Sequence, residues 1–193
     1  NIALGCQALG TGTVTGSYNV VFGKNAAVAL TSGSSNFIAG CSAAKLSETM
    51  AHSIVIGHNA ACAGAANGNQ NILLGGHVAK NITGAYNTIF GVQAGCNVTN
   101  ASHNTFIGSY AGYGAPSSGG SGHCNTAVGL SALYCLTSGN ENVAMGKSAG
   151  RLTTSGSDNT FLGHCAGNTN TTGSNNVAIG CNVELASATG SCQ

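Results

Sequence analysis

Charged residues are scarce in this chain of 193 residues. They make up 5% of it, against roughly 25% in an ordinary soluble protein. The formal net charge is +1 and the cations form no stripe, so nothing supports nucleic-acid binding through phosphate neutralisation. The chain has one proline and no tryptophan, and no apolar run approaches the ~18 residues of a membrane-spanning helix. It shows neither a signal peptide nor an initiator Met, so we expect a fragment or the mature part of a longer protein.

Side chains suited to catalysis or metal binding are also few. The carboxylates are Glu48, Glu141, Asp158 and Glu184, each in a different part of the chain, so no pair is spaced for acid–base chemistry. There is no CxxC and no HxxxH, and the pairs His123-Cys124 and His164-Cys165 lie far apart. The Gly-rich stretches lack the Lys and the helix of a phosphate loop. We therefore expect no enzyme, no cofactor and no metal site.

What the chain does contain is a repeat. Asn recurs through the sequence with Ser53 in one gap, at positions Asn1, Asn19, Asn36, Asn71, Asn87, Asn104, Asn125, Asn142, Asn159 and Asn176. Four residues after each of these starts lies a glycine: Gly5, Gly23, Gly40, Gly57, Gly75, Gly91, Gly108, Gly129, Gly146, Gly163 and Gly180. A small residue, mostly Ala, follows three positions later, and most units are 17 residues long.

Eleven such units cover residues 1–193 as one repeat domain, with starts near 1, 19, 36, 53, 71, 87, 104, 125, 142, 159 and 176. A unit this short cannot bury its own apolar face, so neighbouring units must stack. It has no room for two helices, while its apolar triplets between turn residues suit short strands. The repeat predicts an all-β parallel β-solenoid in which each unit is one coil, forming a rod of roughly 50 Å.

The repeated residues have structural interpretations. Glycine is expected where the backbone turns with positive φ or approaches the next coil closely. The Asn column predicts a ladder of amides that bond from coil to coil or to a turn backbone. The one long unit contains Pro116 and a Ser/Gly run, which predicts a loop bulging from a coil.

The apolar triplets also predict self-association. Side chains alternate along a strand, so the middle residue of each triplet faces one side and its neighbours face the other. The middle residues are all apolar: Ala3, Val21, Ile38, Val55, Leu73, Ile89, Phe106, Ala127, Ala144, Phe161 and Ala178. The third residues are apolar too. One face can fill the interior of the solenoid, and the other needs a cover, for which we expect copies of the chain, with a homotrimer favoured. The alternative is a wider monomeric solenoid.

Nine cysteines are many for such a rod. Within one chain only Cys165 and Cys181 fall in adjacent coils and nearly aligned columns, as a disulfide requires, and an odd number leaves a thiol over or bonded between chains. The simpler interpretation is that Cys replaces Ala or Ser as a small residue. Four N-glycosylation sequons, at Asn81, Asn97, Asn100 and Asn170, matter only for a secreted eukaryotic protein.

Units such as 142–150, Asn-Val-Ala-Met-Gly-Lys-Ser-Ala-Gly, resemble the repeats of phage and virus tail-fibre shafts and, more distantly, the head repeats of trimeric autotransporter adhesins. The resemblance covers all the units. It implies a trimeric, left-handed, extracellular or virion-surface stalk that positions receptor-binding surfaces for a cell-surface receptor or glycan. It does not extend to the Tyr that often follows the Gly in tail-fibre units or to their self-cleaving chaperone domain.

Three functions from different classes follow. A structural shaft or adhesin stalk is the first, with residues 115–123 as the best candidate for receptor contacts. A self-assembling extracellular filament is the second, because the units begin and end in phase and uncapped solenoid ends recruit further strands. An ice-binding solenoid is the third, because Thr88, Thr105, Thr126 and Thr160 share a column, although Val or Ile interrupts it.

Overall fold

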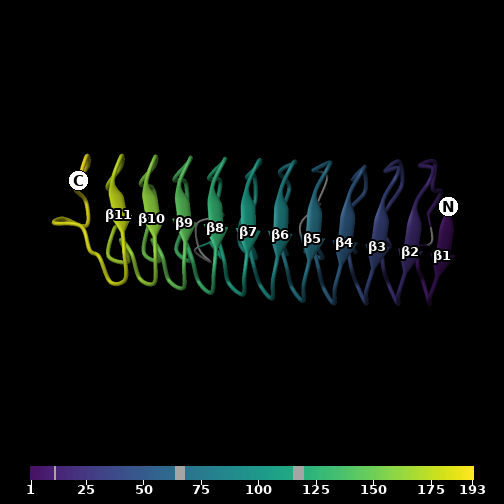
Figure 1. The fold of residues 1–193 in the computed structure, drawn as a ribbon. Coiled ribbons are helices and arrows are strands. Elements are labelled where there is room, and N and C mark those ends of the chain that lie inside the picture. The colour runs from purple at the N-terminus through teal and green to yellow at the C-terminus, as the bar shows by residue number, and fades with distance from the viewer. Residues whose placement is uncertain (11, 64–67, 115–119) are drawn as a thin grey trace.

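The computed structural model describes residues 1–10, 12–63, 68–114 and 120–193. Its regular elements are eleven strands of three residues each. They are β1 (Ile2–Leu4), β2 (Val20–Phe22), β3 (Phe37–Ala39), β4 (Ile54–Ile56), β5 (Ile72–Leu74), β6 (Thr88–Phe90), β7 (Thr105–Ile107), β8 (Thr126–Val128), β9 (Val143–Met145), β10 (Thr160–Leu162) and β11 (Val177–Ile179). The strands form one sheet in sequence order, and Figure 1 shows them side by side along the rod.

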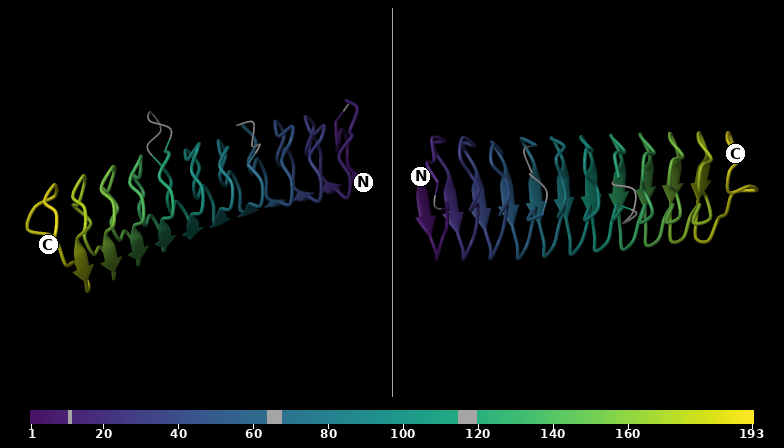
Figure 2. Two further views of the ribbon diagram at one scale, coloured as in Figure 1. Left: turned by 90° about the horizontal axis from the view of Figure 1, so that it is seen from above. Right: turned by 180° about the vertical axis from the view of Figure 1, so that it is seen from behind.

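Every strand pairs in parallel with the next, so the predicted all-β parallel solenoid is confirmed. The predicted triplets coincide with the strands, and successive strands align residue for residue, as in Ile2 with Val20 and Thr160 with Val177. The long unit changes nothing in this register, since Thr105 still pairs with Thr126. In Figure 2 the strands line one long side of the rod and the turns line the other.

The middle residue of each strand points into the solenoid, because alternation sends its two neighbours to the opposite face. These residues are buried in β2 to β11, while Ala3 of β1, at one end of the sheet, stays exposed. The small-residue column faces the same interior and is fully buried from Ala26 to Ala166 where the residue is Ala. A narrow interior lined by strand centres and Ala is therefore the core.

The glycine that follows each strand is required twice over. All eleven have positive φ, from 127° at Gly23 to 145° at Gly75, a region that is essentially closed to other residues. In addition, a β-carbon on Gly5 would lie 2.6 Å from the carbonyl oxygen of Gly23 in the next coil. Backbone conformation and close coil stacking therefore both exclude a side chain at this position.

Positive φ is not confined to glycine, which the sequence did not indicate. Residues two and four positions after the turn glycine, such as Cys165 at 55° and Ala61 at 48°, are left-handed, as is the residue before each ladder Asn. Such residues cost about 1–3 kcal/mol each when isolated. Here the backbone N–H groups bond to neighbouring coils, as in Asn25 N–H to Cys6 O at 2.9 Å and Ala27 N–H to Ala43 O at 2.9 Å. Stacking therefore stabilises a turn that no single coil would keep.

The Asn column forms an amide ladder inside the rod, with one gap at Ser53. Asn142 Nδ2 donates to Asn125 Oδ1 at 3.0 Å and to Gly156 O at 2.9 Å within its own coil. Its Oδ1 accepts from the backbone N–H and from Nδ2 of Asn159, at 3.1 and 2.9 Å. The side chain is fully buried, so these bonds satisfy an amide that would otherwise be costly to bury. Ser53 interrupts the ladder: its hydroxyl accepts from Asn71 N–H at 3.1 Å and donates to Ala51 O.

A second ladder runs two residues before the Asn column. A side-chain oxygen or nitrogen there accepts the backbone N–H of the previous coil, as Ser174 Oγ does from Ser157 at 2.9 Å. His123 joins it through Nδ1, which accepts from Ser102 N–H at 3.1 Å. Of the loop predicted at 115–123, residues 115–119 lie outside the described residues, and Gly120 forms a parallel bridge with Val98.

Candidate association surface

The outer face of the sheet is a mostly apolar stripe that carries no charged residue. We define it as the first and third residues of the eleven strands, none of which is buried. Its large apolar members with more than a third of their surface exposed are Ile2, Leu4, Phe22, Phe37, Ile54, Ile56, Ile72, Ile107, Val143, Met145, Leu162, Val177 and Ile179. No Asp, Glu, Lys or Arg is among its residues. A stripe of this length exceeds the scattered apolar residues that a soluble surface normally carries.

Thr residues occur on this face only in its first column. The structure aligns Thr88 with Thr105 and Thr105 with Thr126, and Val143 then separates Thr126 from Thr160. The hydroxyl row that an ice-binding face would need is thus three coils long before an apolar residue breaks it.

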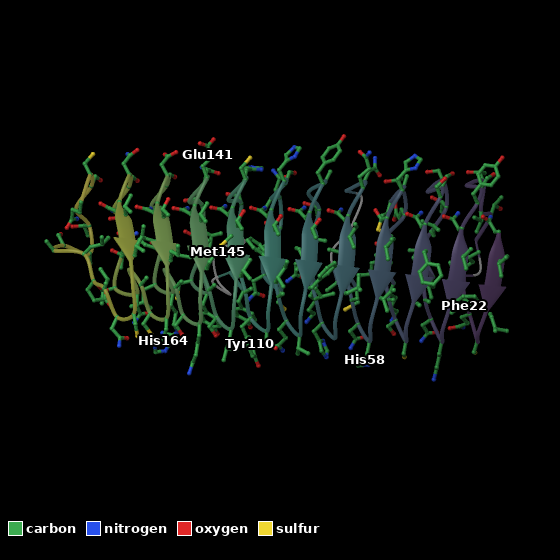
Figure 3. All side chains as sticks on the ribbon, in the orientation of Figure 1. Phe22, His58, Tyr110, Glu141, Met145 and His164 are labelled. Atoms are coloured by element: carbon green, nitrogen blue, oxygen red, sulfur yellow. The ribbon has the colours of Figure 1, made fainter. Side chains whose placement is uncertain are left out.

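Charges flank the outer face instead of lying on it. Figure 3 shows Glu141 on one long edge, His58, Tyr110 and His164 on the opposite edge, and Phe22 and Met145 between them on the sheet. Lys24 and Lys147 directly follow a turn glycine, as His58 and His164 do. Any partner that covers the sheet can therefore do so without burying a charge.

An aromatic cluster lies beyond the turn glycines of the seventh and eighth coils. The rings of Tyr113 and Tyr134 stack at a centroid distance of 4.9 Å, and Tyr110 is tilted against both. The Arg151 guanidinium lies 5.3 Å from the centroid of the Tyr134 ring. Burial, followed by the neighbouring Tyr113, raises the pKa of the Tyr134 hydroxyl. The stack follows the strand repeat, so it reinforces the contacts between coils.

All nine cysteines are free thiols. Cys165 Sγ lies 3.4 Å from Nε2 of His164, and Cys181 Sγ lies 3.6 Å from Nδ1 of the same ring. The structure thus brings together the two cysteines of the predicted disulfide, with an imidazole between them, and their disulfide stays a prediction. Cys96 is nearly fully buried, and this desolvation raises its pKa despite the nearby Lys80 ammonium.

The remaining residues of chemical interest do not converge. Glu184 is used structurally, since its carboxylate accepts the Thr169 hydroxyl at 2.6 Å and the Thr169 N–H at 3.1 Å. Within the described ranges, no three His, Cys, Asp or Glu side chains gather where they could hold a metal ion. The described residues also contain no helix that is long and apolar enough to cross a membrane.

The sequons differ in access. Asn100 is exposed, whereas Asn170 is fully buried and donates to Gly173 O at 3.1 Å. Asn81 and Asn97 are half-buried and donate to carbonyl groups of the next coil, Cys96 and Gly114. Among the four, Asn100 alone is free of these constraints.

Sequence reasoning found the outer face through the period-two pattern, but it missed the aromatic cluster and the thiol–imidazole contacts. Tyr113 and Tyr134 share a column in adjacent coils, as do His164 and Cys181, and a repeat consensus does not display contacts between variable positions. Comparison of the chain with protein-family models, with curated proteins and with solved structures found no match.

Proposed function

We propose that this chain is a non-catalytic structural rod, a segment of an extracellular fibre or stalk, that associates with copies of itself through the outer face of its sheet. The observation that carries the proposal is the charge-free apolar stripe along the whole sheet, flanked by polar edges. In water this stripe would remain exposed on a monomer, and burying it removes apolar surface at about 25 cal/mol per Å².

A parallel homotrimer suits the shape of this surface. The stripe has two columns, the first and the third strand residues, so around a three-fold axis each column can meet a different neighbour. Identical chains in parallel place equivalent coils at one height, which lets the strand repeat continue through the assembly. Association would produce a rigid rod whose polar edges and turns face the solvent, which is the form that an attachment stalk needs.

Sedimentation and negative-stain electron microscopy together test the proposal. We expect a discrete species of three times the 18.8 kDa chain mass, seen as short rods. A monomer at micromolar concentration would overturn the proposal. If that monomer also showed thermal hysteresis, the exposed face would serve ice binding instead, and long continuous fibres would favour a filament.

A further inference from the structure

Charges of opposite sign lie on the two long edges of the outer face. We call the residues directly before the ladder Asn residues and Ser53 the entry edge, and the residues directly after the turn glycines the exit edge. The entry edge contains Glu141 and Asp158 and no Lys or Arg. The exit edge contains Lys24 and Lys147 and no Asp or Glu. All four side chains are exposed, and Figure 3 shows the edges on opposite sides of the sheet, with Glu141 on one and His164 on the other.

The charges of the two edges belong to the same coils. Glu141 and Lys147 flank β9 in one coil. Asp158 and His164 flank β10 in the next coil, at the same spacing of six residues. A chain does not pair these groups with each other, because its own strand separates the two edges. Within the part of the chain that the structure describes, the two carboxylates and the Lys147 ammonium have no partner of opposite charge, so they are available to another molecule.

Two copies of the chain can pack their outer faces together in two simple arrangements. A rotation axis along the rod keeps the copies parallel and brings the entry edge of one copy to the exit edge of the next, at the same height. An axis along the strands makes the copies antiparallel and brings each edge to the same edge of its partner. Glu141 would then meet no Lys or Arg, because the entry edge contains none. Only the parallel arrangement therefore joins the negative edge to the positive edge.

We propose that the entry edge of each chain binds the exit edge of a neighbouring copy, and that paired charges fix the parallel arrangement at equal height. Glu141 pairs with Lys147 of the next copy. Asp158 accepts a hydrogen bond from the His164 imidazole of that copy. Stacked sheets lie about 10 Å apart, a gap that the long side chains of Glu and Lys bridge together. This inference rests on the self-association proposed above and adds which edges meet and what orients them.

The coil of β9 shows how the two parts of such an interface divide their roles. Between Glu141 and Lys147 it presents Val143 and Met145, which are 37% and 40% exposed. An apolar centre with a polar rim is the usual anatomy of a protein interface. The apolar stripe supplies the affinity, whereas complementary charges at the rim select the orientation and the register of the partner.

Lys24 fits the same arrangement. The entry-edge residue of its coil is Tyr18, whose side chain is 82% exposed. An ammonium group over the face of a tyrosine ring is attracted by the ring electrons. In the parallel arrangement both lysines of the exit edge therefore meet a group that attracts a cation, and no coil brings two like charges together.

The test reverses the charges one edge at a time and follows association by sedimentation at low salt, where exposed charges are least screened. Glu141→Lys places an ammonium against Lys147, and Lys147→Glu places a carboxylate against Glu141. Each should raise the protein concentration of half-association at least about tenfold. The double variant, Glu141→Lys with Lys147→Glu, exchanges the two signs and should associate as the wild-type chain does.

Lys45→Glu is the matched control. It changes the net charge as much as Lys147→Glu does, but it lies at an exposed position in the turn of the third coil, away from both edges. We expect it to associate as the wild-type chain does. Circular dichroism checks that every variant folds, as the exposure of these positions predicts.

Mixing supplies a second readout. A contact between a wild-type chain and the double variant brings carboxylate to carboxylate or ammonium to ammonium, so energy transfer between dye-labelled chains should show that the two sort into separate assemblies. Single reversals that associate as the wild type, or a double variant as weak as the single ones, would overturn the edge pairing and leave the structural rod standing. A monomeric wild-type chain would instead overturn the structural proposal, and this one with it.

Discussion

The ring of Phe161 fills the space beside Gly167 in which a β-carbon would lie. Gly150, in the previous coil, has the same relationship to this ring, and Gly112 has it to Phe106. Where the strand contributes Ala127 instead, the turn of the same coil contributes Leu133, and both are fully buried. Large and small residues of strand and turn thus complement one another, within a coil or between neighbouring coils, as close packing requires.

Gly167→Ala should therefore destabilise the rod. The new methyl group overlaps the Phe161 ring, and overpacking of this kind costs about 1–3 kcal/mol. The measurement is urea unfolding followed by circular dichroism. In the double variant with Phe161→Leu the smaller side chain makes room, so most of the loss should be recovered. Simple additivity of the two changes would contradict the packing relationship.

The amide ladder predicts changes of opposite sign at two of its positions. Asn142→Ala leaves Gly156 O and the backbone N–H of Asn159 without their partners, which should cost about 3 kcal/mol or more. Ser53→Asn should gain about 1 kcal/mol, because a second amide can then donate to Asn36 Oδ1, which now accepts one N–H from Ser53. Thermal unfolding of both variants checks this, and a destabilised Ser53→Asn would show that the gap in the ladder is needed.

Charged substitutions on the outer face should weaken association of the chain without preventing its folding. Val143→Lys and Met145→Lys place ammonium groups on side chains that are 37% and 40% exposed, so the single chain should still fold. Buried in an interface, each uncompensated charge should weaken association at least about 100-fold. The matched change Ala144→Lys, between them but facing the interior, should prevent folding. If the chain that carries both Val143→Lys and Met145→Lys sedimented at the same mass as the wild-type chain, this face would be excluded as the interface.

Oxidation should join Cys165 to Cys181. Their α-carbons are offset by one coil and one residue, about 6 Å, which lies within the range of disulfides. Oxidised glutathione would accept the electrons, each of its sulfurs leaving as a thiol while the two protein sulfurs bond. A loop of this length should stabilise the rod by about 3 kcal/mol. Peptide mapping checks the link, and pairing of either cysteine with another partner in the oxidised protein would contradict it.

Cys96 should be alkylated more slowly than the exposed cysteines. Burial raises its pKa and shields its sulfur, so at pH 8 we expect its alkylation by iodoacetamide to be at least about tenfold slower than that of the exposed Cys41. In the unfolded chain Cys96 ionises near its ordinary pKa of 9.0, below the folded pKa, so its contribution to stability falls as the pH rises through 9. Mass spectrometry of labelled peptides measures the alkylation rate of Cys96 in the folded chain, in buffer, and in the unfolded chain, in urea. Equal rates in buffer would contradict the burial.

The strands were predictable because each 17-residue unit must stack on its neighbours and its apolar triplet alternates with a period of two, a combination that fits only a strand. Ile54 and Ile56 face out and Val55 faces in, as their order predicts. The left-handed Ala61 was not predictable, since its conformation depends on N–H groups bonding to another coil. The contacts of His164 with Cys165 and with Cys181, which holds the same position in the next coil, were missed because a consensus does not show which side chains meet at a variable position.

The constant register across the long unit has a consequence for how such a rod changes. Thr105 pairs with Thr126 in the same register as in the shorter units, so strand pairing does not depend on the number of residues in the turn. Residues inserted on the turn side leave the strands in phase, and a whole unit added or removed alters length by one step and leaves every other contact intact. The length of the rod is therefore set by the number of its coils, and the turn of each coil can vary without changing that length.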